Sequence, residues 1–425
     1  MTTAPDLAPN VSRQPEPNHP RLARRGAPVA VRGLAVSLLI GLVGFNGWWF
    51  ARERHPVPTL ETAQHALGQG HFAEAERLLR ERLRTRPRDA TAMVALARAR
   101  AGLNDLLGCA RILRRVPDWS GQRPEALYRA GQSFFQVDHA REAEACWLEL
   151  IHEDPLHPVM PELYTDACSE LLKLYAVEDR WQDAFPVIWS AYDRTSGVDQ
   201  LGWLVSRMRP ELERVSHLEA RTHLIRYLAA DPDDIEARRA LAKAELALGH
   251  RPEAEAQFLE CRKRDPEQVR VWRDFLTMLL EQGDQERLVD LLDHPPRSAD
   301  LEPETWFFRG MMAEKQGEWA QAKARFQKAI ELHPFTPKYY FRLAAVENRL
   351  GEHASAAIHR KRTQQMNDAR AQLASAYNDF LASQAPEATP KRPVRATAAR
   401  RLGSICETLG WARAAQAWNR LAVEL

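Results

Sequence analysis

The sequence predicts an all-α protein, a solenoid of stacked helix-turn-helix hairpins that follows a single N-terminal transmembrane helix. Three observations predict this architecture. Prolines recur 34 residues apart, as at Pro232 and Pro266, and a period of this length is typical of repeat proteins. Ala, Leu, Arg and Glu dominate the composition, without alternating runs of β-branched residues, which favours helices over strands. An uncharged stretch of 19 residues occupies positions 33–51.

Residues 1–32 precede that stretch and are rich in Pro, Arg and Ala. A segment of this composition cannot bury enough apolar surface to fold by itself. We therefore expect a disordered, Arg/Pro-rich tail. Five arginines lie in this tail, whereas only Arg52 and Arg54 closely follow the apolar stretch. The positive-inside rule then places the tail in the cytoplasm and exports the remainder of the chain.

Residues 33–51, GLAVSLLIGLVGFNGWWFA, are about long enough to cross a bilayer as a helix. Trp48 and Trp49 at its end suit the interfacial aromatic belt. A cleaved signal peptide is the alternative, but its apolar core is shorter and ends in small residues. Lys is scarce, nine against 50 Arg, which favours a bacterial source. The predicted location is the cell inner membrane, single-pass, with the array in the periplasm.

Residues 56–363 divide into about nine blocks of one design. Each block has an apolar helix, a short turn, a second helix that begins with an aromatic and a small residue, and a closing turn with Pro. Small residues such as Ala75, Ala143 and Ala322 let the paired helices approach, while a large residue four places on fills the adjacent groove. The turn glycines are expected in the left-handed conformation that ends a helix; they are Gly70, Gly249, Gly283, Gly317 and Gly351.

The regular spacing ends after residue 363. Residues 364–394 are predicted as one more helix followed by a Pro-rich linker, and residues 395–425 as a terminal hairpin with Trp411, Ala414 and Trp418. This hairpin either caps the array or folds back on it, and the sequence leaves both possibilities open.

The clearest block carries Trp306, Gly310, Ala322, Phe326 and Pro334. In this pattern it resembles the tetratricopeptide repeat family. The resemblance implies a right-handed superhelical solenoid whose first helices line a concave groove. It also implies that the chain binds other proteins or extended peptides in that groove.

The side chains that the resemblance points into the groove, in the blocks from 235 to 363, are cations interleaved with aromatic and apolar residues. Such a surface suits an extended peptide with carboxylates, because the charges pair and the rings pack. The alternative is an ordinary solvated face whose charges pair internally. The candidate residues are Arg239, Lys243, Arg270, Arg273, Phe307, Met311, Lys338, Phe341 and Arg342.

No pattern in the sequence indicates catalysis. Gly-rich phosphate loops, nucleophile elbows and zinc-finger spacings are missing. His152 and His157 are five residues apart, whereas a helical metal pair needs a spacing of four. The five cysteines form no CxxC pair and are predicted to be buried packing residues. The sequence therefore predicts a protein that is not an enzyme, with no catalytic residue, metal, cofactor or small-molecule substrate.

Charge excludes one class of partner. Outside residues 1–54 the chain carries 52 basic and 54 acidic side chains, so it lacks the basic footprint that nucleic acid requires. The predicted function is a membrane-anchored scaffold or adaptor for proteins of the cell envelope. One alternative is a non-catalytic subunit of an envelope biogenesis enzyme complex, for cytochrome maturation or polysaccharide export. Another is a cytoplasm-facing regulator of envelope lipid synthesis.

Overall fold

The computed structural model describes residues 59–152, 160–208, 215–384 and 392–425. The chain divides into two compact units, residues 1–59 and 60–425. The tail at 1–32 and the transmembrane segment at 33–51 lie outside the described residues, so both stay predictions. None of the described helices is long and apolar enough to cross a membrane.

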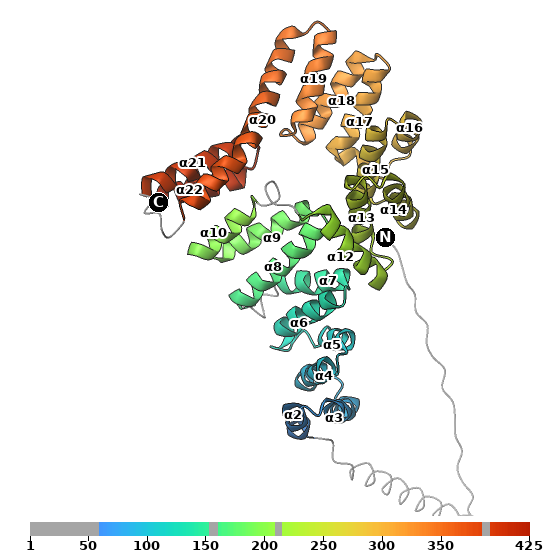
Figure 1. The fold of residues 1–425 in the computed structure, drawn as a ribbon, viewed down its shortest axis with the longest axis vertical. Coiled ribbons are helices and arrows are strands. Elements are labelled where there is room, and N and C mark those ends of the chain that lie inside the picture. The colour runs from blue at the N-terminus through green and yellow to red at the C-terminus, as the bar shows by residue number, and fades with distance from the viewer. Residues whose placement is uncertain (1–58, 153–159, 209–214, 385–391) are drawn as a thin grey trace, which may run out of the picture. The chain divides into compact units, whose positions relative to one another are not determined.

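The described part of the chain is all-helical, with 20 α-helices, one 3-10 helix and no strand. Successive helices pair as antiparallel hairpins (Figure 1). The first four pairs are α2 (Leu60–Gly68) with α3 (Phe72–Thr85), α4 (Ala90–Gly102) with α5 (Leu106–Leu113), α6 (Arg123–Gln136) with α7 (Ala140–Ile151), and α8 (Pro161–Val177) with α9 (Trp181–Arg194).

Two helices follow that flank a gap in the described residues, α10 (Gly197–Ser206) and α12 (His217–Ala230). The remaining hairpins continue to the C-terminus. They are α13 (Ile235–Ala247) with α14 (Arg251–Arg264), α15 (Val269–Gln282) with α16 (Gln285–Asp293), α17 (Pro303–Lys315) with α18 (Trp319–Leu332), α19 (Pro337–Arg349) with α20 (His353–Ala382), and α21 (Arg392–Thr408) with α22 (Ala412–Glu424). The 3-10 helix η1 (Ala299–Leu301) precedes α17.

The turns between paired helices have the conformation that the sequence predicts. All five turn glycines named above have positive φ, for example 77° at Gly317, where a side chain would be strained. Three turns use Asn104, Asp138 and Asp179 instead, with φ between 51° and 63°. Asn and Asp tolerate this region better than other residues with side chains.

Interlocking small and large residues hold each hairpin together, as the repeat pattern predicts. Ala143 and Ala322 are fully buried. Gly131 faces the indole of Trp147 so closely that a Cβ atom there would lie 2.3 Å from the ring nitrogen. Gly310 faces Phe326 in the same way. The aromatic ring of the second helix therefore occupies the space left by the missing side chain of the first.

The C-terminal region departs from the expected division of the chain. Helix α20 runs without interruption from His353 to Ala382 and so crosses residue 363, where the sequence analysis separates the ninth block from a further helix. The hairpin α21–α22 packs on α20 and also on Leu204 and Met208, within and just after α10. Its Arg413 pairs with Asp193 of α9 at 2.5 Å.

Candidate docking sites

Two of the predicted groove cations are engaged inside the molecule. Arg239 of α13 is only 2 % exposed, and its guanidinium donates to Glu236 at 2.9 Å and to Asp274 at 2.7 Å. Arg270 of α15 donates two parallel hydrogen bonds of 2.6 Å to the carboxylate of Asp183 on α9. These charges are compensated by the chain itself and are not free for a partner.

Three further predicted cations also have internal partners. Lys243 pairs with Asp179 in the α8–α9 turn. Arg273 lies 3.3 Å from Glu302, and Arg342 lies 3.6 Å from Glu314. The alternative interpretation of the sequence, a face whose charges pair internally, therefore describes these five cations of α13, α15 and α19.

An ion cluster explains why these charges point inward. Arg180, at the start of α9, donates to Glu144, Glu178 and Asp183 over distances of 2.7–2.9 Å, and Arg270 adds a second guanidinium on Asp183. Burial by itself would raise the pKa of Asp183, but hydrogen bonds from Arg270 and Arg180 outweigh it and lower that pKa to about 2. The cluster holds α9 against α15, so the charged side chains in it stabilise the fold.

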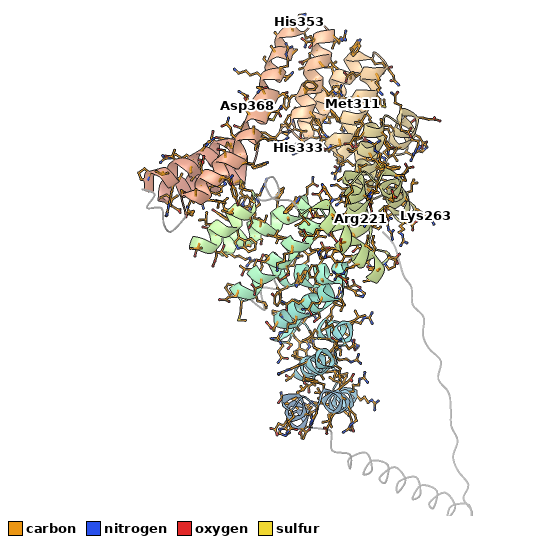
Figure 2. The ribbon with its side chains drawn as sticks, viewed as in Figure 1. Arg221, Lys263, Met311, His333, His353 and Asp368 are labelled. Atoms are coloured by element: carbon orange, nitrogen blue, oxygen red, sulfur yellow. The ribbon has the colours of Figure 1, made fainter. Side chains whose placement is uncertain are left out.

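The apolar members of the predicted groove differ in exposure. Phe307 is buried, with its ring centroid 5.2 Å from that of Tyr339. Met311 on α17 is half-buried in the same core (Figure 2). Phe341 on α19, by contrast, is 58 % exposed. Only Phe341 therefore presents a large apolar surface to solvent.

Phe341 borders a hollow of about 510 Å³ between α19 and α20, which we call the α19–α20 notch. Lys338 and Phe341 of α19 face Asn367 and Arg370 of α20 across it. The Lys338 ammonium lies 5.0 Å from the centroid of the Phe307 ring. Neither Lys338 nor Arg370 has an ion-pair partner among the described residues. The notch combines two available cations with one exposed aromatic ring.

The repeat pattern predicts one side of this notch and not the other. Lys338 and Phe341 were candidates, but Asn367 and Arg370 fall beyond residue 363, where the repeat was expected to end. The signal that could have found them is the apolar periodicity of Met366, Ala369 and Leu373, all buried in α20, which continues the helix past that point.

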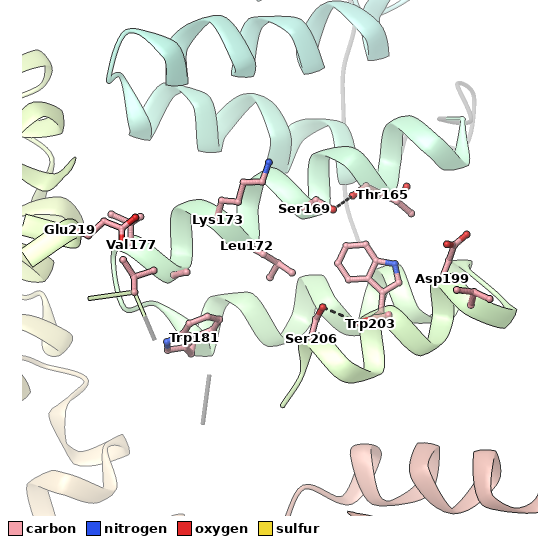
Figure 3. Close-up of a pocket in the computed structure, with 14 residues that line it drawn as sticks. Thr165, Ser169, Leu172, Lys173, Val177, Trp181, Asp199, Trp203, Ser206 and Glu219 are labelled. Carbon is pink, nitrogen blue, oxygen red and sulfur yellow. Dashed lines mark hydrogen bonds between the residues drawn. The ribbon is translucent and has the colours of Figure 1, made fainter. Parts of the chain in front are cut away.

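A second hollow, the α8–α10–α12 groove, lies outside the predicted site and has a volume of about 940 Å³. Figure 3 shows Leu172 of α8 next to Trp203 of α10, while Val177 of α8 lies toward Trp181 of α9. Asp199 and Glu219 lie at opposite ends of the groove in this view. None of these residues belongs to the predicted groove, which begins at residue 235.

Within the described ranges, no three His, Cys, Asp or Glu side chains are placed to hold a metal ion. All five cysteines are buried and unpaired, as predicted for packing residues. Burial raises the pKa of the Cys168 thiol to about 12, so at neutral pH it is protonated and a poor nucleophile. His157 of the His152–His157 pair lies outside the described residues.

Two segments match family models described as tetratricopeptide repeat, residues 60–108 and residues 303–335. The second match covers the α17–α18 hairpin, in which Gly310 and Phe326 interlock. Both segments are tetratricopeptide repeats. Such repeats bind other proteins or peptides, and the proteins built from them are generally non-catalytic interaction scaffolds. No curated protein sequence matches the chain.

Several solved structures are partly similar to this repeat protein. MamA 41-end from Desulfovibrio magneticus RS-1 is 20 % identical with a TM-score of 0.32, covering 39 % of this chain and 94 % of its own. PilF from Pseudomonas aeruginosa is 17 % identical with a TM-score of 0.32, covering 51 % and 86 %. The APC/C hetero-tetramer Cut9–Hcn1 is 15 % identical with a TM-score of 0.30, covering 85 % and 79 %. These partial likenesses carry no conclusion about partners.

Proposed function

We propose that this protein is a non-catalytic docking scaffold of the cell envelope. A helix at 33–51 anchors it in the inner membrane with the N-terminus in the cytoplasm, and the array projects into the periplasm. There it holds an acidic, extended segment of a partner protein in the α19–α20 notch. The observation that carries the docking proposal is the pair of available cations, Lys338 and Arg370, on either side of the exposed Phe341.

The chemistry of the notch favours an acidic segment. Residues 337–384, which contain α19 and α20, carry seven basic and four acidic side chains. A carboxylate between Lys338 and Arg370 would gain two charge-assisted hydrogen bonds, which are stronger than neutral ones. An apolar side chain next to it would cover the ring of Phe341 and remove it from water, at roughly 25 cal/mol per Å² buried. The Asn367 amide can then donate to the backbone of the bound segment.

Capture in cells tests this proposal. A photo-crosslinking amino acid at Phe341 is expected to trap envelope proteins, and the same probe at Lys361 serves as the control. Lys361 is exposed on α20. At 100° per residue it lies about 160° around the helix from the face with Thr363 and Arg370, which lines the notch. Trapped segments, identified by mass spectrometry, should be rich in Asp and Glu.

The charge dependence gives the decisive comparison. The double variant Lys338→Glu with Arg370→Glu is expected to lose the Phe341 cross-links, since it reverses both charges. Lys361→Glu makes a similar exposed change outside the notch and should keep them. Equal trapping at Phe341 and Lys361, or trapping that survives the double variant, would rule out the notch as the docking site.

A further inference from the structure

The α8–α10–α12 groove is separate from the notch and has a different chemistry. Its walls are Leu172 and Val177 of α8, Trp181 of α9 and Trp203 of α10. The backbone along its floor is open, because a Cβ atom at Gly202 would meet no atom within 4 Å. Small residues between large apolar ones leave room for the backbone of another helix to approach.

The hydroxyl groups of the groove are already engaged. Ser169 donates to the carbonyl of Thr165 at 2.9 Å, and Ser206 donates to the carbonyl of Gly202 at 2.9 Å (Figure 3). The Thr165 hydroxyl likewise donates to the carbonyl of Glu162. An extended peptide would therefore find few partners for the backbone groups turned toward the floor, and unpaired buried groups are costly. A helix satisfies its own backbone and escapes this cost.

The ends of the groove carry uncompensated negative charge. Asp199 and Glu219 are exposed and have no ion-pair partner among the described residues, whereas Lys173 on the rim is paired with Glu170 at 2.9 Å. Residues 160–208, which contain α8, α9 and α10, carry eight acidic and four basic side chains. The occupant of this groove therefore needs basic residues toward both of its ends.

We propose that the α8–α10–α12 groove receives an amphipathic α-helix of a partner protein, with an apolar stripe against Leu172, Trp181 and Trp203 and basic residues next to Asp199 and Glu219. The lining of α8 runs from Thr165 to Val177, which is about 18 Å at 1.5 Å per residue. A helix of about 12 residues spans that length. Apolar anchors at helical spacing in a groove are a recurrent mode of recognition.

The test uses the full chain and synthetic peptides labelled with a fluorophore. The probe is a helix-stabilised peptide of about 16 residues, which exceeds the groove length, with Leu at positions i, i+3, i+4 and i+7 and two Arg at each end. A scrambled peptide of the same composition lacks the stripe. Fluorescence anisotropy is expected to show binding of the patterned peptide and at least tenfold weaker binding of the scrambled one.

Two variants locate the binding. Gly202→Leu projects into the groove from a position where a Cβ atom meets no atom within 4 Å, and it replaces a helix-interior Gly by a better helix former. The chain should therefore keep its thermal stability and lose peptide affinity at least tenfold. Asp199→Lys with Glu219→Lys reverses the charge at both ends and should also weaken binding. The controls are Glu162→Lys, an exposed change on α8 outside the lining, and the notch variant Lys338→Glu. Both should bind as the unmodified chain does.

Four results would overturn the proposal. The first is equal binding of the patterned and scrambled peptides, and the second is an unchanged peptide affinity of the Gly202→Leu variant. The third is equally tight binding of a probe whose helix is interrupted by Pro, which would show that the occupant is extended. The fourth is self-association of the unmodified chain in sedimentation that Gly202→Leu abolishes, which would show that a second copy of this chain fills the groove.

Discussion

The Glu178 carboxyl group is the most deeply buried acid in the ion cluster, at 2 % exposure. It accepts a hydrogen bond from Arg180 at 2.8 Å, but Arg180 also serves Glu144 and Asp183. Burial raises the pKa of Glu178 to about 8, and the attraction of Arg180 offsets only part of this effect. One guanidinium shared among three acids does not compensate all of them.

This pKa predicts a pH dependence of stability. The native chain holds the Glu178 proton up to about pH 8, whereas the unfolded chain releases it near its ordinary pKa of 4.5. Between these values the native state binds more protons, so the free energy of unfolding falls as the pH rises. Glu178→Gln cannot ionise and should be spared this loss, which is on the order of 5 kcal/mol at most, at about 1.4 kcal/mol per pKa unit.

The measurement is thermal unfolding of the full chain at pH 5.5, 7 and 8.5. The melting temperature of Glu178→Gln, relative to the unmodified chain, should rise steadily across this series. Glu162→Gln, which changes an exposed carboxylate, should show no such trend. Parallel curves for Glu178→Gln and the unmodified chain would show that Glu178 is ionised throughout.

At the scale of elements, the hairpin α17–α18 depends on one missing side chain. A Cβ atom at Gly310 would lie 2.6 Å from Cε1 of Phe326, and Phe326 is fully buried. An Ala in a helix interior is favoured over Gly by about 1 kcal/mol, but overpacking a core costs about 1–3 kcal/mol. The clash therefore exceeds the gain.

We expect Gly310→Ala to lower the stability of the chain by up to about 2 kcal/mol, the balance of overpacking against helix propensity. Gly202→Ala is the matched control, because Gly202 is also inside a helix and has open space around it. It should be neutral or slightly stabilising. Chemical denaturation of both variants measures the difference, and a stabilising effect of Gly310→Ala would contradict the interlocked packing.

At the scale of the whole molecule, the two hollows differ in sign of charge. The notch lies in a region with excess Lys and Arg, and the groove lies in one with excess Asp and Glu. Charge complementarity determines which partner binds more than it determines how tightly that partner binds. The two proposed docking sites therefore suit chemically different partners.

The proposed periplasmic location of the array rests on residues 33–51 acting as a membrane anchor. Alkaline phosphatase fused after Leu425 should be active if the array is periplasmic, because that enzyme needs export to fold. Deletion of residues 33–51 should abolish the activity and serves as the control. Activity of a β-galactosidase fusion at the same position, without phosphatase activity, would place the array in the cytoplasm and favour a cytoplasm-facing regulator.

Much of the fold was predictable because repeats are encoded locally. The left-handed turns at Gly70 and Gly351 and the buried Ala143 and Phe326 follow from their position in the repeat. The candidate site was less predictable. Of its nine residues, Lys338 and Phe341 border a hollow, whereas Arg239 and Arg270 pair with acids 35 and 87 residues away. A repeat pattern shows which helix face a residue occupies and not which distant acid lies opposite.

The sequence by itself determined the helical hairpins, their turns and the burial of small residues such as Ala143 and Ala322 between paired helices, because each depends on contacts within one repeat or between neighbours. Only the tertiary structure decided which charges are available. The ion cluster at Arg180 joins α7, α8, α9 and α15, and α21–α22 packs against α10. These contacts join residues far apart in the chain, so their pairing depends on how the hairpins stack. The notch and the groove are the surfaces that this stacking leaves open.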